Sequence, residues 1–174
     1  MFTGLIESTL QLTRREPLGE AGTGARFWFE TPGLGPDQAA WEPQLGESLA
    51  ISGCCLTLAA LEPDGGLVFD LTSETLEVTW LNDIEVGDVV NLERSVRLAD
   101  RIGGHMVSGH VDSLGSIVGI EDTGDGGQSI SFEVPAGFER YLVPKGSVAI
   151  DGISLTVVQP AGRRFQVAVI PETL

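Results

Sequence analysis

The sequence contains only two cysteines, Cys54 and Cys55, and they are neighbours. Adjacent cysteines rarely form a disulfide because the geometry of such a bridge is strained, and no third cysteine offers a partner. The chain has no Cys-x-x-Cys pair, and His105 and His110 are too poorly spaced to share a metal in a predicted strand or loop. We therefore expect free thiols, as in a cytoplasmic protein, and no metal site.

Basic residues and long apolar runs are also scarce. Ten Lys and Arg face 25 Asp and Glu, giving a formal net charge of −15. Phosphate binding needs a basic surface, so no nucleic-acid partner is expected, and the acidity suits solubility. No apolar run approaches the roughly 18 residues of a membrane span, and no signal-peptide pattern precedes the first motif. We expect a cytoplasmic protein without a membrane partner.

What the sequence does contain is an internal repeat. The two copies share four blocks in the same order: residues 3–8 with 108–113, 29–32 with 132–135, 46–58 with 146–157, and 74–76 with 172–174. Four matched blocks in one order predict two copies of a unit of about 100 residues, a size that can bury its own core. The predicted domains are residues 1–97 and 98–174.

The two copies differ where chemistry can differ. Cys54-Cys55 in the first copy is replaced by Ile153-Ser154 in the second. The second copy also stops at Leu174, the partner of Leu76, so the turn and the last strand of the first copy have no counterpart. We expect the second copy either to be incomplete or to close in a different way.

The composition of both copies favours strands. Short runs rich in β-branched or aromatic residues are separated by Gly-, Pro- and Asp-rich turns. The expected strands are residues 26–30, 48–51, 56–58, 67–71 and 89–93. Strands at this spacing predict a small barrel or sandwich. Short helical pieces are expected at residues 35–41, 136–142 and 72–76, the last capped by Thr72 or Ser73.

Five motifs in one order carry a family resemblance: residues 1–7 (MFTGLIE), 53–57 (GCCLT), 103–112 (GGHMVSGHVD), 151–156 (DGISLT) and 170–174 (IPETL). With them the whole chain resembles the riboflavin synthases that have two lumazine-binding domains, without the C-terminal end of that family. The resemblance implies an all-β protein with two duplicated Greek-key six-stranded β-barrels, the second lacking its last strand.

The resemblance also implies a reaction. Riboflavin synthases are transferases that use two molecules of 6,7-dimethyl-8-ribityllumazine, one of which donates a four-carbon unit to the other. The products are riboflavin and 5-amino-6-ribitylaminouracil, and no cofactor or metal takes part. Each barrel is expected to hold one lumazine, and the active site to form between subunits of a homotrimer.

Site residues are carried over from the same motifs. The catalytic candidates are Cys55, Ser48, His110 and Ser154. The substrate-binding candidates of the first barrel are Phe2, Gly4, Leu5, Ile6, Leu56, Thr57, Asp70, Leu71, Thr72, Ser73, Glu74 and Thr75. Those of the second barrel are Gly109, Val111, Lys145, Leu155, Thr156, Ala168, Val169, Ile170, Pro171, Glu172 and Thr173. Hydroxyls and carboxylates among them suit a ribityl chain.

Other interpretations of these residues stay open. Cys55 also fits a small buried hydrophobe, Lys145 a solvated turn, and His105 a structural role. The family places a catalytically implicated aspartate just beyond its last strand, and Ser95 stands at the corresponding position of the first copy. The absent end favours a non-catalytic lumazine- or flavin-binding protein of the same fold, whereas Cys55 and His110 favour the enzyme. A flavin-reductase barrel is a third alternative, but no GxGxxG loop follows a strand.

Overall fold

The computed structural model describes residues 1–20, 22–33 and 41–173. These described residues are mostly β, as the sequence predicts, with one short α-helix and a few 3-10 turns among them. Within the described residues, no helix has the length and apolar character needed to cross a membrane. The helical piece predicted at residues 35–41 lies outside the described residues except for its last one.

The chain divides into two compact units. The first consists of Met1–Val111 with Asp151–Ile153, and the second of Asp112–Ile150 with Ser154–Leu174. Residues 98–111, which the repeat assigns to the second copy, therefore pack with the first unit. The boundary after residue 97 marks where the first copy of the sequence repeat ends. That the two folding domains also divide there stays a prediction.

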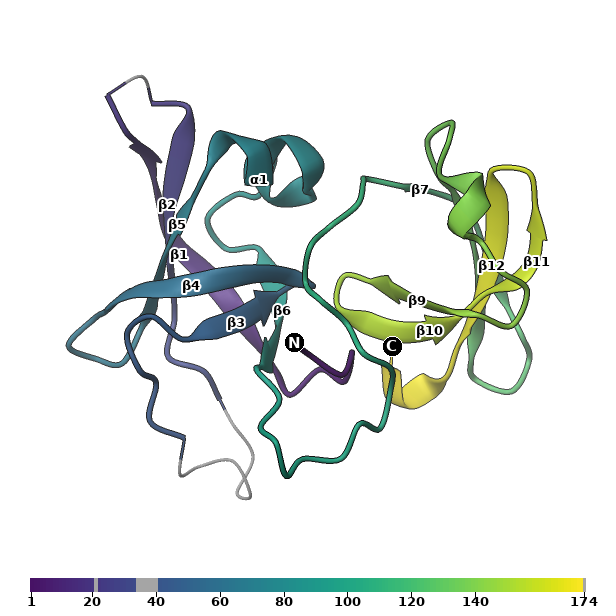
Figure 1. Cartoon of the computed structure of the whole chain (residues 1–174), viewed down its shortest axis with the longest axis horizontal. Helices are drawn as coiled ribbons and strands as arrows, with labels where there is room; N and C mark the ends of the chain where they lie inside the picture. The colour runs from purple at the N-terminus through teal and green to yellow at the C-terminus, as the bar shows by residue number, and fades with distance from the viewer. Residues whose placement is uncertain (21, 34–40, 174) are drawn as a thin grey trace. The chain divides into compact units, whose positions relative to one another are not determined.

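The first unit is a closed six-stranded barrel, drawn from purple to teal in Figure 1. Its strands are β1 (Ser8–Leu18), β2 (Gly24–Phe29), β3 (Ser48–Ile51), β4 (Cys54–Leu61), β5 (Leu67–Leu71) and β6 (Val89–Arg94). They close in the order β1-β2-β5-β4-β3-β6, with antiparallel neighbours. Helix α1 (Ser73–Val78) and the 3-10 turn η2 (Trp80–Asn82) follow β5. The predicted first barrel is confirmed.

Period-two alternation produces the core of this barrel. In β2 every second side chain is buried, and Phe27 and Phe29 point inward. Phe29 makes edge-to-face contacts with Phe27 and with Phe69 of β5, with ring centroids 6.2 and 6.0 Å apart. Burying each such ring contributes about 1.5–3 kcal/mol, so this cluster is a main source of barrel stability.

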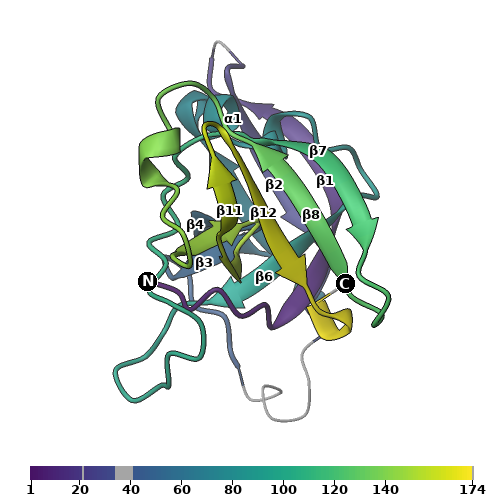
Figure 2. The same cartoon turned by 90° about the vertical axis from the view of Figure 1, so that its right-hand side faces the viewer.

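The second unit is built from two sheets. Its strands are β7 (Ser116–Asp122), β8 (Gln128–Glu133), β9 (Ser147–Ile150), β10 (Ile153–Thr156), β11 (Val158–Ala161) and β12 (Arg164–Val169). Figure 2 shows the sheet β11-β12-β8-β7, and β10 pairs with β9 separately. The described residues of this copy thus do not close a barrel. The helix predicted at residues 136–142 is only a 3-10 turn, η3 (Glu139–Tyr141), and η4 (Pro171–Thr173) ends the described chain.

The register of the strands supports the duplication. Phe27 pairs with Phe69 and Phe29 with Leu67, while their repeat partners pair in the same way, as Ile130 with Val167 and Phe132 with Phe165. The turns before β4 and β10 also share a left-handed backbone, with φ of 43° and 80° at Ser52 and Gly53 and 48° and 84° at Asp151 and Gly152.

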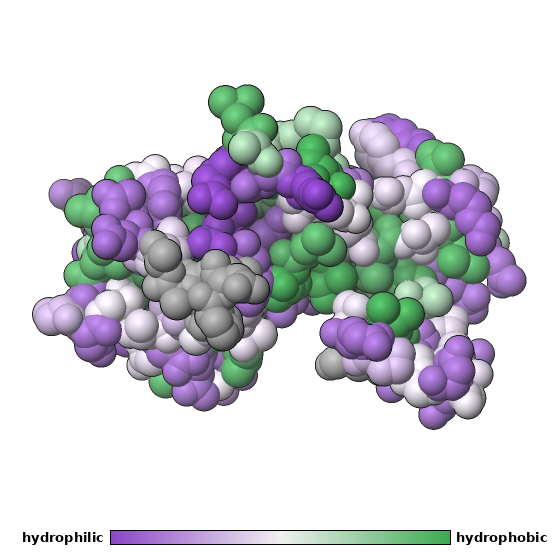
Figure 3. Space-filling model, turned by 90° about the horizontal axis from the view of Figure 1, so that it is seen from below, coloured by the Kyte–Doolittle hydropathy of each residue, from purple (hydrophilic) through white to green (hydrophobic). Residues whose placement is uncertain are grey.

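The two units bury their apolar residues to different extents. The core of the second unit has four buried members: Val157, Phe165, Val167 and Val169. On its strand β7, Ile117, Val118 and Ile120 are each about half exposed (57, 46 and 56%). Figure 3 shows hydrophobic residues, coloured green, at the surface among hydrophilic ones on the face that it draws.

Candidate active site

Three strands of the first barrel bring two of the four catalytic candidates, Cys55 and Ser48, onto one outer face. Ala50 of β3 pairs with both Cys55 of β4 and Glu93 of β6, so these residues form one row across the strands. Side chains two residues apart share a face, and Ser48 pairs with Thr57 in the neighbouring row. The sheet therefore places Cys55, Ser48 and Thr57 side by side.

The two adjacent cysteines have opposite environments. Cys54 is 7% exposed and belongs to the barrel core. Burial raises the pKa of its thiol to about 11, with a smaller contribution from Cys55, so it stays protonated at neutral pH. Cys55 is half-buried and packs against the small cluster of Phe2, Ala50 and Val107. Cys54 is the small buried hydrophobe, and Cys55 is the thiol available at the site.

The N-terminal segment covers Cys55. Phe2 is 1% exposed and exchanges two backbone hydrogen bonds with Val107, at 2.8 and 3.0 Å. The Cys55 N–H donates to the carbonyl of Gly109 at 2.8 Å. A Cβ on Gly109 would lie 2.6 Å from Cys55 Cβ and 2.8 Å from Phe2 Cε2, and its φ is +81°. Only glycine fits there, which explains this residue of the motif.

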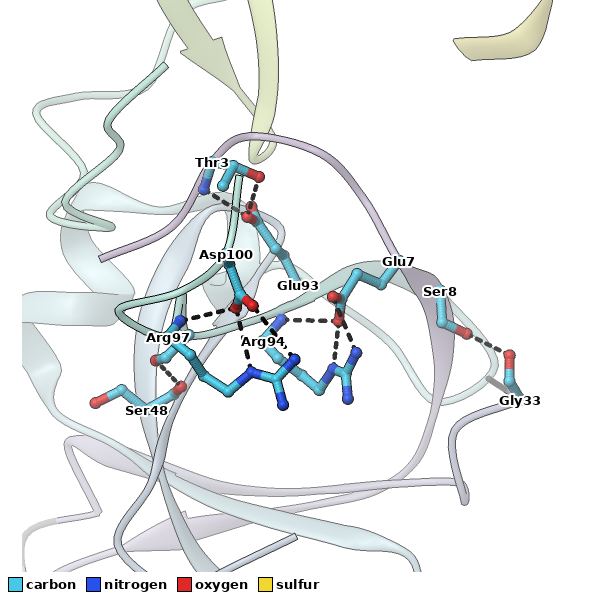
Figure 4. Close-up of polar contacts among 10 residues, drawn as sticks. Thr3, Glu7, Ser8, Gly33, Ser48, Glu93, Arg94, Arg97 and Asp100 are labelled. Carbon is cyan, nitrogen blue, oxygen red and sulfur yellow. Dashed lines mark hydrogen bonds and ion pairs between the residues drawn. The ribbon is translucent and has the colours of Figure 1, made fainter. Parts of the chain in front are cut away.

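A buried carboxylate holds the same segment, and the sequence did not reveal it. Glu93 is 3% exposed, and its Oε1 accepts from the Thr3 N–H at 2.5 Å and from Thr3 Oγ1 at 2.7 Å (Figure 4). Its Oε2 accepts from the Gly4 N–H at 3.0 Å. The only sequence signal was an acid at an otherwise strand-like position.

Polar contacts also fix the edge of the site at Ser48. The Ser95 hydroxyl donates to the Ser48 carbonyl and ties the end of β6 to the start of β3. Next to Ser95, the Arg94 guanidinium bonds the Glu7 carboxylate at 2.6 Å (Figure 4). Desolvation raises the pKa of Glu47, the neighbour of Ser48, so this acid holds a proton more readily than an exposed glutamate.

The segment after β5 supplies hydroxyls at one end of the barrel. The antiparallel register of β4 and β5 brings the start of β4 to the end where β5 finishes. The Thr72 hydroxyl caps helix α1 by accepting from the Thr75 N–H at 3.2 Å, which selects Thr72 over Ser73 as the cap. Glu74 lies in the first turn, where a negative charge is favourable.

An ion pair occupies the last outward position of β5. Arg26 donates to both carboxylate oxygens of Asp70, at 2.5 and 2.6 Å. This bidentate hydrogen bond lowers the pKa of Asp70, with a smaller Coulombic contribution from the same guanidinium. Asp70 is therefore ionised at neutral pH and is already engaged by Arg26.

Other predicted residues of the first unit lie apart from this row. His110 is exposed, and its N–H bonds the Ser108 hydroxyl at 3.2 Å. Val111 packs on the core of the first unit rather than of the second. Leu5 is 51% exposed, and Ile6 is half-buried. Leu56 and Leu71 point into the barrel core, so a ligand could reach only their backbone.

The predicted residues of the second unit are more exposed. Lys145 adopts a φ of 63° in a turn and donates its N–H to the Val157 carbonyl at 2.9 Å, as a turn residue does. Ser154 and Leu155 are half-buried, and Val169 is a core residue. The exposed candidates are Thr156, Ala168, Ile170, Pro171 and Glu172, with Thr173 half-buried.

No metal centre is evident among the described residues, because no three His, Cys, Asp or Glu are grouped to hold an ion.

Comparison with known proteins decides the family. Residues 3–95 and 108–174 each match the lumazine binding domain. The chain is 39% identical over 176 residues to riboflavin synthase of Mycobacterium bovis, covering 99% of this chain and 83% of that protein. It is equally identical to the Escherichia coli riboflavin synthase, covering 78% of it. The chain belongs to the riboflavin synthase family. The riboflavin synthase of Chlamydia muridarum is 48% identical over 128 residues, which cover 74% of this chain and 62% of that enzyme.

Solved structures share the fold of this riboflavin synthase family member. LumP in complex with 6,7-dimethyl-8-(1′-D-ribityl)lumazine superposes with a TM-score of 0.81 at 17% identity, covering 99% of this chain and 88% of that one. LumP in complex with riboflavin also gives 0.81, covering 97% and 86%. The duplicated β architecture is thus one that binds these two ligands in LumP.

Proposed function

We propose that this chain is a riboflavin synthase that converts two molecules of 6,7-dimethyl-8-ribityllumazine into riboflavin and 5-amino-6-ribitylaminouracil. One lumazine gives up a four-carbon unit and the other receives it, so the atoms of two substrates equal those of the two products. The reaction needs no external oxidant or reductant, and we expect no cofactor or metal.

One observation carries this proposal. The chain contains two lumazine-binding repeats with the same strand register, and at one equivalent position they hold a thiol in one repeat and a hydroxyl in the other, Cys55 and Ser154. Two related binding domains suit two identical substrates that play different roles. Holding two reactants in place supplies a large part of the acceleration by proximity.

The residues of the first unit suggest a division of labour. Cys55, Ser48 and Thr57 present a thiol and two hydroxyls on one face, and Cys55 packs against the cluster that contains Phe2. A thiol is more nucleophilic than a hydroxyl and suits the chemical step, whereas hydroxyls suit hydrogen bonds to the ligand. We propose that Asp70 and the residues of the α1 segment, Thr72 through Thr75, bind the polar ribityl chain.

The assembly and the cellular location remain proposals. We propose a homotrimer in which the first unit of one subunit faces the second unit of another and the site is shared, with the cytoplasm as its location. The oligomeric state is measured by light scattering with and without lumazine. A fully active monomer would contradict the shared site.

A turnover assay tests the function directly. The protein is incubated with 6,7-dimethyl-8-ribityllumazine, and riboflavin formation is followed by absorbance and fluorescence. We expect two lumazines consumed for each riboflavin formed. Tight lumazine binding without riboflavin would instead indicate a non-catalytic lumazine- or flavin-binding protein, which relatives of 36–48% identity named riboflavin synthase do not favour.

A further inference from the structure

We propose that Glu93 is a positioning residue, whose buried carboxylate locks Phe2, Thr3 and Gly4 onto the sheet and so keeps Phe2 against Cys55. The inference deepens the proposed function and rests on it for its turnover readout. The structural part, a latch between β6 and the N-terminal segment, has a readout of its own.

The carboxylate of Glu93 is buried on the outside of the barrel. Glu93 projects from the outer face of β6, opposite Ala50, yet it is only 3% exposed because the N-terminal segment lies over it. A carboxylate buried in this way is costly unless hydrogen-bond donors surround it. The nearest cation along the strand, Arg94, bonds to Glu7 instead. The stabilisation of Glu93 therefore depends on donors from the segment above it.

The hydrogen-bond donors to Glu93 come from two residues of the N-terminal segment, Thr3 and Gly4. Glu93 accepts three hydrogen bonds: two from the N–H and hydroxyl of Thr3, drawn in Figure 4, and one from the N–H of Gly4. Gly4 has a φ of +77°, a left-handed conformation that glycine adopts without strain. Successive N–H groups turned toward one acceptor form a small anion-binding concavity, here filled by the protein's own carboxylate. Such charge-assisted hydrogen bonds are about twice as strong as neutral ones.

The segment that Glu93 holds lies next to the Cys55 thiol. Phe2 immediately precedes Thr3, and its ring packs with Ala50 and Val107 beside Cys55. None of these residues belongs to the main barrel core, which is a separate cluster. Releasing the latch should therefore free the segment and uncover Cys55 while the barrel stays folded.

The test compares Glu93→Gln with Glu85→Gln, a matched change at an exposed loop glutamate. A glutamine has the same shape, but its amide nitrogen would face an N–H donor. The native proteins are treated with iodoacetamide, and alkylation of each cysteine is followed by mass spectrometry. We expect Cys55 in Glu93→Gln to react at least about tenfold faster than in the control, since local opening governs access. Cys54, buried in the core, should stay unlabelled.

Turnover gives the second readout. If the chain is a synthase, kcat of Glu93→Gln should fall by at least about tenfold, with a smaller change in KM. Equal labelling of Cys55 in both variants overturns the inference, and so does Cys54 reacting together with Cys55, because that pattern means general unfolding. If the wild-type protein makes no riboflavin, the proposed function fails. The difference in Cys55 labelling between Glu93→Gln and Glu85→Gln still shows whether Glu93 holds the N-terminal segment.

A second pair of variants covers the case in which Glu93→Gln does not fold. Thr3→Val removes one of the three donors, and Thr3→Ser keeps that hydroxyl. The latch requires faster Cys55 labelling in Thr3→Val and near wild-type labelling in Thr3→Ser. Identical rates in the two variants overturn it.

Discussion

The two repeats keep one backbone plan but differ in how completely they bury it. In the first, Phe27, Phe29 and Phe69 are at most 1% exposed inside a closed barrel. In the second, the stacked pair Phe132 and Phe165 sits in a small core flanked by half-buried neighbours. Equal register with unequal burial shows that strand pairing and core closure are specified separately.

The chemistry of the two repeats has diverged at matched positions. Cys55 corresponds to Ser154, and the paired Arg26 and Asp70 correspond to the paired Ser129 and Ala168. The first unit thus carries a thiol and a fixed ion pair where the second carries small neutral groups. This is the pattern expected when two copies of one binding unit hold the same ligand in two roles.

The largest expected effect tests the difference in burial. Phe27→Ala should lower the free energy of unfolding by about 3–5 kcal/mol, since it leaves a cavity in a closed core. Phe165→Ala should cost less by at least about 1 kcal/mol, because its surroundings can collapse or admit water. Urea unfolding followed by circular dichroism measures both. All three tryptophans lie in the first unit, so their fluorescence separates its transition. Equal costs would mean equally closed cores.

The next effect concerns the thiol. Cys55→Ser should reduce turnover at least tenfold, about 1.4 kcal/mol of transition-state stabilisation, with lumazine binding and thermal stability nearly unchanged. Ser154→Ala should instead weaken binding in the second repeat. Cys54→Ser is the matched control: it should lower the melting temperature because it buries a hydroxyl in the core, while the folded fraction keeps its rate. A Cys55→Ser variant that only melts earlier would make Cys55 a packing residue.

Much of the fold could be predicted because short local stretches of sequence specify many of its strands and turns. The bounds of β3 and β5 agree with the predicted strands at 48–51 and 67–71, where β-branched and apolar runs end at turns. Strand β1 was missed, because its second half carries Arg14, Arg15, Glu16 and Pro17 and shows no apolar alternation. These residues form a strand because they pair with β2 and β6, and a local sequence pattern does not reveal such pairing.

The residues of the candidate site also fall into those that local motifs indicate and those that only contacts distant in sequence reveal. Phe2, Cys55 and Gly109 could be proposed as candidates because their motifs recur in a known family. Glu93 was missed because its burial depends on Thr3, 90 positions away, and a glutamate on an outward strand position normally faces water. Arg26 was missed as well, since only the register of β2 and β5 shows that it faces Asp70.

A smaller effect concerns the cap of helix α1. Thr72→Ala should destabilise this helix by about 1 kcal/mol, because the Thr75 N–H loses its acceptor. The equivalent residue of the second repeat, Ile170, has no capping oxygen and precedes Pro171, so Ile170→Ala should leave η4 unchanged. Hydrogen exchange of the Thr75 amide should accelerate about fivefold in Thr72→Ala. Unchanged exchange would show that packing of Leu76, rather than the cap, maintains the helix.

The smallest effect is the pH dependence of the Arg26–Asp70 pair. The side-chain hydrogen bond from Arg26 lowers the pKa of Asp70 in the folded protein below the ordinary value of about 3.9. Ionised Asp70 therefore stabilises the fold above that value, and the contribution is lost as the pH falls through the lower, folded value. Asp70→Asn should be slightly less stable than wild type at pH 7, by less than the cap variant because the pair is partly exposed. The stabilities of the two proteins should converge as the pH falls through the lowered, folded pKa of Asp70. Ala168→Asp, opposite Ser129, provides the control, since it adds a carboxylate without a guanidinium and should show no gain at pH 7. Thermal melts across this pH range measure the stability of both variants. A stability difference between Asp70→Asn and wild type that does not change with pH would show that the Arg26–Asp70 ion pair does not stabilise the first unit.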